Sequence, residues 1–267
     1  MSRILVTGAT GNVGKHVFST LAEAGLDVRA LVRNPEKVPG DAVRGDLTDP
    51  GSIDGALRDV ESVFLVWPGF EASAAAPVIE RIARHARRIV YLSASHGTAF
   101  HQGVEGLIRQ TGLSWTFLRP GGFAANTLGW AAQIREGVVR WPYGQARRAL
   151  IHEKDIAAVA VHTLTSAGHG GAAYELSGPA VISQEDQVRT IGEVVGRQVR
   201  WEDLSPEVAR EHLLAAWGDP GFVDTALETW KAFVTSPEEV TATVERLLGR
   251  PALTFRQWAE DHADDFR

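Results

Sequence analysis

The sequence predicts an α/β fold in which a doubly wound parallel sheet is followed by a smaller, mainly helical part. Two observations predict the sheet. Apolar segments of strand length alternate with helical segments up to residue 118, and a glycine-rich turn joins the first strand to the first helix. A third observation predicts the helical part, because the strict alternation stops at Phe123 and helical periodicity dominates afterwards. Right-handed crossovers leave few other topologies for such a chain.

The first strand, over residues 3–7, leads into a glycine-rich turn over residues 8–14 and a helix over residues 15–24. The first glycine permits a tight turn, the second lets a pyrophosphate approach the main chain, and the third lets the helix pack closely. The N-terminal end of a helix also favours an anion. The spacing Gly-x-x-Gly-x-x-Gly is one residue wider at its start than the usual dinucleotide fingerprint. We predict dinucleotide binding, rather than a ligand-free turn, by Gly8, Thr10, Gly11, Asn12, Val13 and Gly14.

The ends of the next two strands indicate which dinucleotide binds. The strand over residues 27–32 ends at Arg33, and at this position an arginine accommodates a 2′-phosphate whereas a carboxylate binds a free 2′-hydroxyl. NADP(H) is therefore favoured over NAD(H), with a merely solvated Arg33 as the alternative. Asp46 and Leu47 follow the strand over residues 42–45, where Asp46 can accept a hydrogen bond from the adenine amino group.

Three further strands, over residues 62–66, 88–93 and 113–118, end at the edge of the sheet where open α/β folds bind ligands. We assign cofactor contacts to residues that follow or end these strands, namely Trp67, Pro68, Ser93, Ala94, Pro120 and Phe123. Phe70 and His96 lie in the same turns and are candidates for substrate binding. Serines at strand ends also cap helices or close turns, and that alternative stays open for Ser93.

Composition and charge exclude several classes of protein. The net charge of −6 argues against a general nucleic-acid-binding surface, and no apolar run approaches the roughly 20 residues that span a bilayer. The chain has no cysteine, and its histidines show no metal-ligand spacing, so we expect no metal site. Because the first predicted strand begins at residue 3, we expect no signal peptide. We expect a cytoplasmic protein that binds neither nucleic acid nor membrane, and a homodimer stays open.

Several motifs in combination resemble the atypical short-chain dehydrogenase/reductases of the NmrA-like group, from residue 1 to about residue 200. The motifs are the segments at residues 8–14, 31–35, 45–47, 91–95, 114–121 and 152–157. The resemblance implies a Rossmann-type fold. It also implies either an NAD(P)H-dependent reductase or a protein that binds the cofactor as a redox sensor without turning it over.

Orthodox members of the wider superfamily use a Tyr-x-x-x-Lys pair as the acid, and none of the three tyrosines here has a lysine four residues later. The equivalent helix carries His101 and Glu105, which lie on one helix face at i and i+4. Glu105 can orient and charge His101, so that an imidazolium donates the proton. The alternative is a structural or surface pair. Ser95, an ordered water or an acidic hydroxyl of the substrate are the other proton sources.

The second half of the chain has a different composition, since seven of the eight tryptophans fall at or after residue 115. We expect a Rossmann core over residues 1–180, with residues 122–150 contributing to a substrate cleft, and a mainly helical substrate or lid subdomain over residues 181–267. Trp130, Trp141 and Trp217 are the candidates for lining that cleft, although most large aromatic side chains are core residues.

Together these features favour an NADPH-dependent reductase that transfers hydride to a carbonyl or conjugated double bond. The substrate is expected to be a small hydrophobic molecule, with a weak preference for an aromatic one. The alternative from a different class is a non-catalytic NAD(P)-binding redox sensor. A sugar-nucleotide epimerase is less favoured, because it usually needs the absent tyrosine–lysine pair.

Overall fold

The computed structural model describes residues 3–69, 71–95, 97 and 99–267, which form two compact units. The sheet unit consists of Met1–Gly121, Glu153–Leu176 and Thr243–Pro251. The helical unit consists of Gly122–His152, Ser177–Ala242 and Ala252–Arg267. This grouping differs from the predicted boundary at residue 180 in two places, because residues 122–152 group with the helical unit and residues 243–251 group with the sheet unit.

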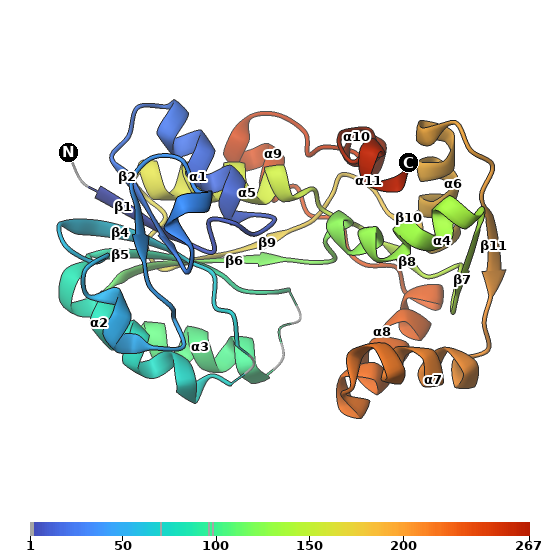
Figure 1. Cartoon of the computed structure of the whole chain (residues 1–267), viewed down its shortest axis with the longest axis horizontal. Helices are drawn as coiled ribbons and strands as arrows, with labels where there is room; N and C mark the ends of the chain where they lie inside the picture. The colour runs from blue at the N-terminus through green and yellow to red at the C-terminus, as the bar shows by residue number, and fades with distance from the viewer. Residues whose placement is uncertain (1–2, 70, 96, 98) are drawn as a thin grey trace. The chain divides into compact units, whose positions relative to one another are not determined.

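The sheet unit contains a seven-stranded parallel sheet in the order β3-β2-β1-β4-β5-β6-β9 (Figure 1). The strands are β1 (Arg3–Thr7), β2 (Val28–Val32), β3 (Ala42–Arg44), β4 (Val60–Leu65), β5 (Arg88–Leu92), β6 (Ser114–Pro120) and β9 (Ala172–Leu176). The order reverses between β1 and β4, so a doubly wound Rossmann-type sheet is confirmed.

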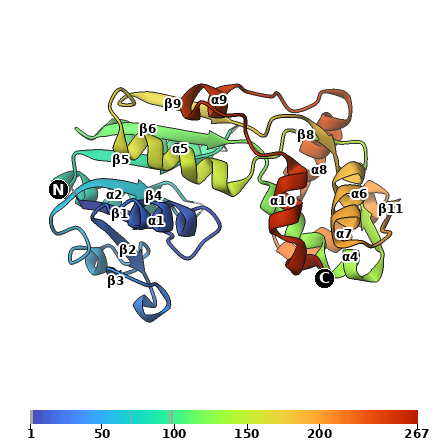
Figure 2. The same cartoon turned by 90° about the horizontal axis from the view of Figure 1, so that it is seen from above.

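Helices cover both faces of this sheet, as Figures 1 and 2 show. One face carries α1 (Gly14–Glu23), α5 (Glu153–Thr165) and α9 (Thr243–Leu248), and the other carries α2 (Ala76–His85) and α3 (Ala99–Arg109). Short 3-10 turns occupy Pro35–Lys37, Pro50–Ile53 and Ser73–Ala75. Asp49 caps the second of these turns by accepting a hydrogen bond from the Gly51 N–H.

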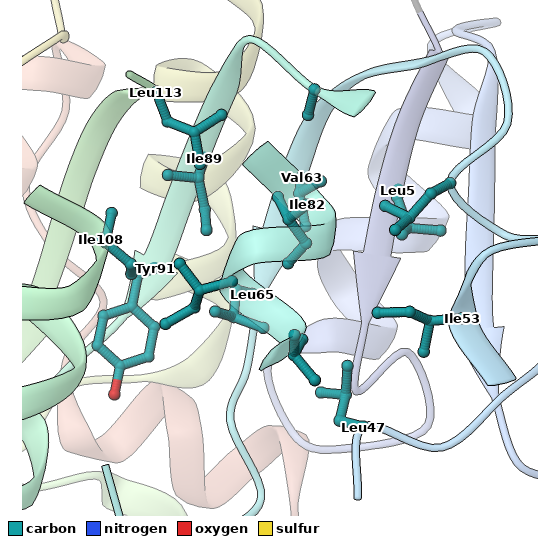
Figure 3. Packing of buried hydrophobic residues seen from close by; sticks show 14 of the residues in the cluster. Leu5, Leu47, Ile53, Val63, Leu65, Ile82, Ile89, Tyr91, Ile108 and Leu113 are labelled. Carbon is teal, nitrogen blue, oxygen red and sulfur yellow. The ribbon is translucent and has the colours of Figure 1, made fainter. Parts of the chain in front are cut away.

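The core between the sheet and the α2/α3 layer explains why the strands read as continuous apolar runs (Figure 3). Leu5, Val63 and Ile89 point from the strands toward Ile82 on α2. Each fully buried aliphatic side chain contributes about 1.5–3 kcal/mol relative to exposure. Tyr91 lies in the same core, where burial raises the pKa of its phenol, so it cannot replace the missing tyrosine acid.

The helical unit has its own core. Its helical elements are a 3-10 segment (Ala124–Trp130), α4 (Ala131–Glu136), α6 (Gln184–Val195), α7 (Pro206–Trp217), α8 (Pro220–Thr235), α10 (Phe255–Asp261) and α11 (Ala263–Phe266). Two short strand pairs, β7 (Val138–Trp141) with β11 (Arg200–Asp203) and β8 (Arg147–Arg148) with β10 (Ile182–Ser183), complete it. Ser183, Ser205, Asp219 and Thr254 cap the helices that follow them.

Residues 243–251 return to the sheet unit because α9 packs on α5 there, and because Arg250 forms an ion pair of 2.8 Å with the buried carboxylate of Asp155. Periodicity predicts that such a segment is helical, but it does not say which core the apolar face joins.

Candidate active site

The glycine-rich turn has the geometry that a bound pyrophosphate requires. Gly8 has a left-handed φ of +63°, and a Cβ there would lie 3.1 Å from the Val66 Cβ. A Cβ on Gly14 would lie 2.2 Å from the Gly8 carbonyl oxygen, so no side chain fits where α1 meets the turn. The Gly11 N–H donates to that same oxygen at 2.8 Å. The turn is therefore closed by main-chain contacts, and only glycine allows them.

The other predicted residues of this turn differ in how far they are exposed to solvent. Thr10, Gly11 and Asn12 form an exposed tip, whereas Val13 is buried beneath it. The first N–H groups of α1 follow directly, and a helix leaves these donors without partners inside the helix. The exposed tip and these donors fit an anionic diphosphate.

Arg33 and Asp46 lie at adjoining strand ends, because the Gly45 N–H donates to the Val32 carbonyl oxygen at 3.0 Å. The Asp46 carboxylate accepts hydrogen bonds from the Thr48 N–H and hydroxyl at 2.9 and 2.8 Å. These two bonds, and the nearby charge of Arg33, hold the pKa of Asp46 below its usual range. Arg33 is exposed, and among the described residues its guanidinium forms no hydrogen bond or ion pair, so it is available to a 2′-phosphate.

Leu47 is 7% exposed and its side chain packs into the core beneath the sheet. The predicted cofactor contact of Leu47 can therefore involve only its main chain.

The end of β4 is fixed to the glycine-rich turn by Thr7. The Thr7 hydroxyl accepts from the Val66 N–H at 2.8 Å and donates to the Val66 carbonyl oxygen at 3.3 Å. The predicted residues Trp67 and Pro68 follow directly. Within the described part of the chain, the buried Trp67 Nε1 has no hydrogen-bond partner. Phe70, predicted to bind substrate, lies outside the described residues.

An ionic cluster occupies the ends of β5 and β6. Glu105 on α3 is 3% exposed, and its carboxylate accepts hydrogen bonds from Ser93 at 2.8 Å, from Arg119 at 2.6 and 2.8 Å, and from Arg109 at 3.0 Å. Burial alone would raise the pKa of Glu105, but the Arg119 and Ser93 hydrogen bonds and the two arginine charges more than offset it and lower that pKa. Glu105 is therefore an ionised anchor that joins α3 to two strand ends.

Arg119 is the centre of this cluster. It also forms an ion pair of 3.2 Å with Glu175 on β9, and its hydrogen bond to Glu105 raises the guanidinium pKa. The Arg109 guanidinium lies over the rings of Trp115 and Phe117, at 5.1 and 4.8 Å from their centroids. A polar hollow of about 420 Å³ opens among these side chains, lined by Ser93, Ala94, Gly97, His101, Gln102, Glu105, Arg109, Arg119 and Glu175.

The pKa of His101 does not shift in the direction that an imidazolium donor requires. Burial lowers the pKa of His101 below its ordinary value of 6.5, although the charge of Glu105 acts the other way. The imidazole is therefore neutral at pH 7. The predicted pairing of His101 with Glu105 does not make His101 a cationic acid, because Glu105 is ion-paired with Arg119 and Arg109.

Ser93 and Ser95 form different hydrogen bonds, one through its side chain and the other through its main chain. The Ser93 hydroxyl is used by Glu105, whereas the Ser95 main-chain N–H donates to the Pro120 carbonyl oxygen at 2.8 Å. This bond joins two predicted site residues at the ends of β5 and β6. His96, predicted to bind substrate, lies outside the described residues.

The remaining predicted residues belong to the helical unit. Phe123 pairs with Ile151 in a parallel bridge just after β6. Trp130 is buried in the core of the helical unit, so a direct contact with substrate is not available to its ring. Trp141 is half-buried against the same core, and Trp217 is 40% exposed.

Sequence reasoning missed Arg119, Arg109 and Glu175 as parts of this region. The available signal was Glu105 itself, which stands between Val104 and Ile108 on the apolar face of α3. A buried carboxylate needs a cationic partner, and Arg119 is the one charged residue of β6.

Within the described residues, no helix is long and apolar enough to cross a membrane. No cluster of three metal-binding side chains occurs in the described ranges either. A dinucleotide fits the observed donors, because the glycine turn leaves room where a Cβ would clash and Arg33, which has no partner among the described residues, lies beside Asp46.

Comparison with known proteins agrees with this geometry. A family model described as NAD(P)H-binding matches residues 8–167. The chain is 40% identical to a (4-alkanoyl-5-oxo-2,5-dihydrofuran-3-yl)methyl phosphate reductase of Streptomyces griseus, over 98% of this chain and 99% of that protein. It is 32% identical to an NAD(P)H azoreductase of Xenophilus azovorans, with 98% and 99% of the two chains covered.

Among solved structures, the NADPH-dependent quinone oxidoreductase of Escherichia coli complexed with NADPH matches with a TM-score of 0.81. That match has 25% identity and covers 97% of this chain and 99% of the other. These relatives favour a reductase over the non-catalytic redox sensor. The chain thus belongs to the NAD(P)H-binding, NmrA-like atypical short-chain dehydrogenase/reductases, and it is an NAD(P)H-dependent oxidoreductase.

Proposed function

We propose that this protein uses NADPH to reduce the conjugated carbon–carbon double bond of an acylated butenolide phosphate. The observation that carries the proposal is the 40% identity, over nearly the whole of both chains, to a reductase of (4-alkanoyl-5-oxo-2,5-dihydrofuran-3-yl)methyl phosphate. The acyl chain of such a substrate is the hydrophobic part that the sequence predicts. Arg33, exposed beside Asp46, supports NADPH rather than NADH as the reductant.

The absence of a tyrosine acid suits this substrate class. In such a ring the double bond joins carbons 3 and 4, and carbon 4 carries both the lactone carbonyl and the alkanoyl carbonyl. A new C–H bond forms at carbon 3, the π electron pair moves onto carbon 4 and the two carbonyl oxygens, and a proton from water completes a C–H bond at carbon 4. Bound NADPH supplies the hydride for this reaction and leaves as NADP⁺. Two carbonyl groups share the developing charge, so the transition state does not need a strong acid.

The residues of the chain then have positioning roles. The turn at Gly8–Gly14 holds the pyrophosphate, and Asp46 accepts from the adenine amino group. Neutral His101 and Ser95 donate hydrogen bonds to an enolate oxygen, which stabilises charge without transferring a proton. Glu105 and Arg119 hold the ends of β5 and β6 rather than contacting the reacting atoms.

A first experiment measures loss of NADPH absorbance with an acyl-butenolide phosphate, a quinone and an azo dye under identical conditions. We expect kcat/KM for the butenolide phosphate to exceed the other two by at least about 100-fold, since binding energy must favour the correct substrate by several kcal/mol. Equal rates with the quinone, or tight NADPH binding without turnover of any substrate, would contradict the proposal.

A second experiment tests the proton source. Because water supplies the proton, kcat should be nearly independent of pH between 6 and 8. A kcat that falls as pH rises through the lowered pKa of His101, and that loses this dependence in His101→Phe, would instead assign proton donation to the imidazole.

A further inference from the structure

The polar hollow of the sheet unit extends beyond the residues to which the proposed function gives a role. It has a volume of about 420 Å³ and is lined by side chains of α3 together with residues at the ends of β5, β6 and β9. His101, Glu105 and Arg109 follow one another at intervals of four residues, so they lie on successive turns of α3. The hollow therefore runs along this helix, with His101 near one end and Arg109 near the other.

Arg109 is the cation of this hollow that has unused donors. Its NH2 atom donates to Glu105 at 3.0 Å, and within the described ranges its Nε and NH1 atoms form no further hydrogen bond. Arg119, in contrast, donates from all three guanidinium nitrogens to Glu105 and Glu175. The Arg109 side chain is 43% exposed, so a ligand in the hollow can reach its guanidinium. Such an arginine is suited to bind a phosphate through parallel hydrogen bonds.

The guanidinium of Arg109 is held in place before a ligand binds. Glu105 fixes one nitrogen from four residues back along α3, because helical side chains lean toward the N-terminus of the helix. The guanidinium also lies over the rings of Trp115 and Phe117, at 5.1 and 4.8 Å from their centroids. These two rings are stacked, with centroids 4.3 Å apart. A guanidinium fixed in this way loses little side-chain entropy when it binds an oxyanion.

The charges that line the hollow do not repel an anion. Glu105 and Glu175 carry two negative charges, and Arg109 and Arg119 carry two positive charges. Both carboxylates are ion-paired with Arg119, whereas Arg109 shares only Glu105. Burial lowers the pKa of His101, which therefore adds no charge at pH 7. An oxyanion gains a charge-assisted contact at Arg109 and meets no unbalanced carboxylate.

The length of the hollow suits the substrate of the proposed function. The Arg109 guanidinium lies beside the Glu105 carboxylate, and Glu105 is about one helical turn, or about 5.4 Å, from His101 along α3. In the butenolide ring the phosphomethyl group on carbon 3 and the lactone carbonyl at carbon 5 point away from each other across carbon 4, which gives a similar span. We propose that Arg109 binds the phosphate monoester of the substrate while a carbonyl oxygen lies near His101. This inference rests on the proposed function and adds the residue that selects the phosphorylated form.

The test compares the butenolide phosphate with its dephosphorylated alcohol in steady-state kinetics at saturating NADPH. Wild-type protein should have a kcat/KM at least about 30-fold higher for the phosphate, which is the ratio expected for one charge-assisted pair. Arg109→Met removes the charge, so it should reduce this preference to less than about threefold by raising KM for the phosphate rather than by lowering kcat. Arg109→Lys keeps the charge without the planar fork, and it should retain an intermediate preference of about 10-fold.

Arg84→Met is the matched control. Arg84 also pairs with a glutamate four residues back on a helix, namely Glu80 on α2 at 3.7 Å, but its side chain is 66% exposed and does not line the hollow. The phosphate preference of Arg84→Met should equal that of wild type. An equal fall in Arg84→Met and Arg109→Met would assign the effect to a general loss of surface charge and overturn the role of Arg109.

The remaining outcomes separate this inference from the proposed function. If the wild type reduces the alcohol as well as the phosphate, or if folded Arg109→Met keeps the phosphate preference, the role of Arg109 is overturned while the proposed function stands. If neither butenolide is reduced, the proposed function fails and this inference fails with it.

A measurement on the wild-type protein keeps the inference testable should Arg109→Met not fold. At saturating NADPH, inorganic phosphate should compete with the butenolide phosphate and raise its KM. Sodium chloride at the same ionic strength should raise that KM much less, because it only screens the charge of Arg109. An equal effect of the two salts would overturn the inference.

Discussion

The glycine-rich turn and the Ser93–Glu105–Arg119 cluster both lie at the carboxyl ends of strands in one sheet, yet different kinds of interaction hold them together. The turn is closed by main-chain atoms, with the Gly8 carbonyl oxygen 2.2 Å from where a Gly14 Cβ would stand. The cluster is closed by ionised side chains around a buried carboxylate. The turn should therefore fail when volume is added, and the cluster should fail when charge is removed.

The largest effect is expected from adding one methyl group to the turn. Gly14→Ala forces the start of α1 away from Gly8, and we expect the Kd for NADPH to rise by at least about 100-fold, equivalent to about 3 kcal/mol. Isothermal titration calorimetry measures this change. Gly55→Ala is the control, because a Cβ there meets no atom within 4 Å, and its Kd should match wild type. Equal affinities in the two variants would show that the turn has room to spare.

The corresponding change in the cluster removes charge and keeps volume. Glu105→Gln leaves Arg119 and Arg109 without their shared counter-charge, and we expect a loss of about 3 kcal/mol in the free energy of unfolding. Urea denaturation measures it. Glu80→Gln breaks an exposed i,i+4 pair with Arg84 and should cost less than about 0.5 kcal/mol. If Glu105→Gln lost as little unfolding free energy as Glu80→Gln, the cluster would not anchor α3.

A smaller effect on NADPH affinity is expected at Arg33, which follows β2. Arg33→Ala should weaken NADPH binding by about 30-fold, because one charge-assisted contact to a 2′-phosphate is worth about 2 kcal/mol. NADH carries no such phosphate, so its Kd should stay within about twofold. Lys37→Ala, a nearby exposed charge, is the control. An equal loss for both nucleotides would contradict the assignment of Arg33.

The smallest effect is a dependence on pH that distinguishes the cluster from the turn. The folded-state pKa of Glu105 lies below its ordinary value of 4.5, so its stabilisation is fully present above pH 4.5 and declines as pH falls through the lower, folded-state pKa. The stability difference between wild type and Glu105→Gln should thus be constant from pH 7 to about 5.5 and narrow below 4.5. A stability difference that widens on acidification would contradict the lowered folded-state pKa of Glu105. The NADPH affinity lost in Gly14→Ala should not follow this dependence.

The sequence was most informative where the signal is local. Gly8, Gly11 and Gly14 fall between a strand and a helix within a few residues, and the structure shows why each lacks a side chain. Arg119 was not recognised as part of the site, because its partner Glu105 lies 14 residues away on α3 and meets it only where that helix packs against β6. Charge pairing between a helix and a strand leaves no periodic pattern in a single sequence.

The organisation of the helical unit was harder to predict from the sequence, for a related reason. Apolar periodicity indicates helices in this part of the chain, where α6 and α7 begin at the capping serines Ser183 and Ser205. It did not show that residues 243–251 leave the helical unit or that Trp130 is a core residue, because both depend on which apolar faces meet.

The chain passes between its two units at residues 121–122, 152–153, 176–177, 242–243 and 251–252. Neither unit is therefore a continuous stretch of polypeptide, and no single truncation separates them. A chimaera that exchanges one unit with a relative must splice the gene at every one of these junctions, and deleting every residue after 242 removes material from both units.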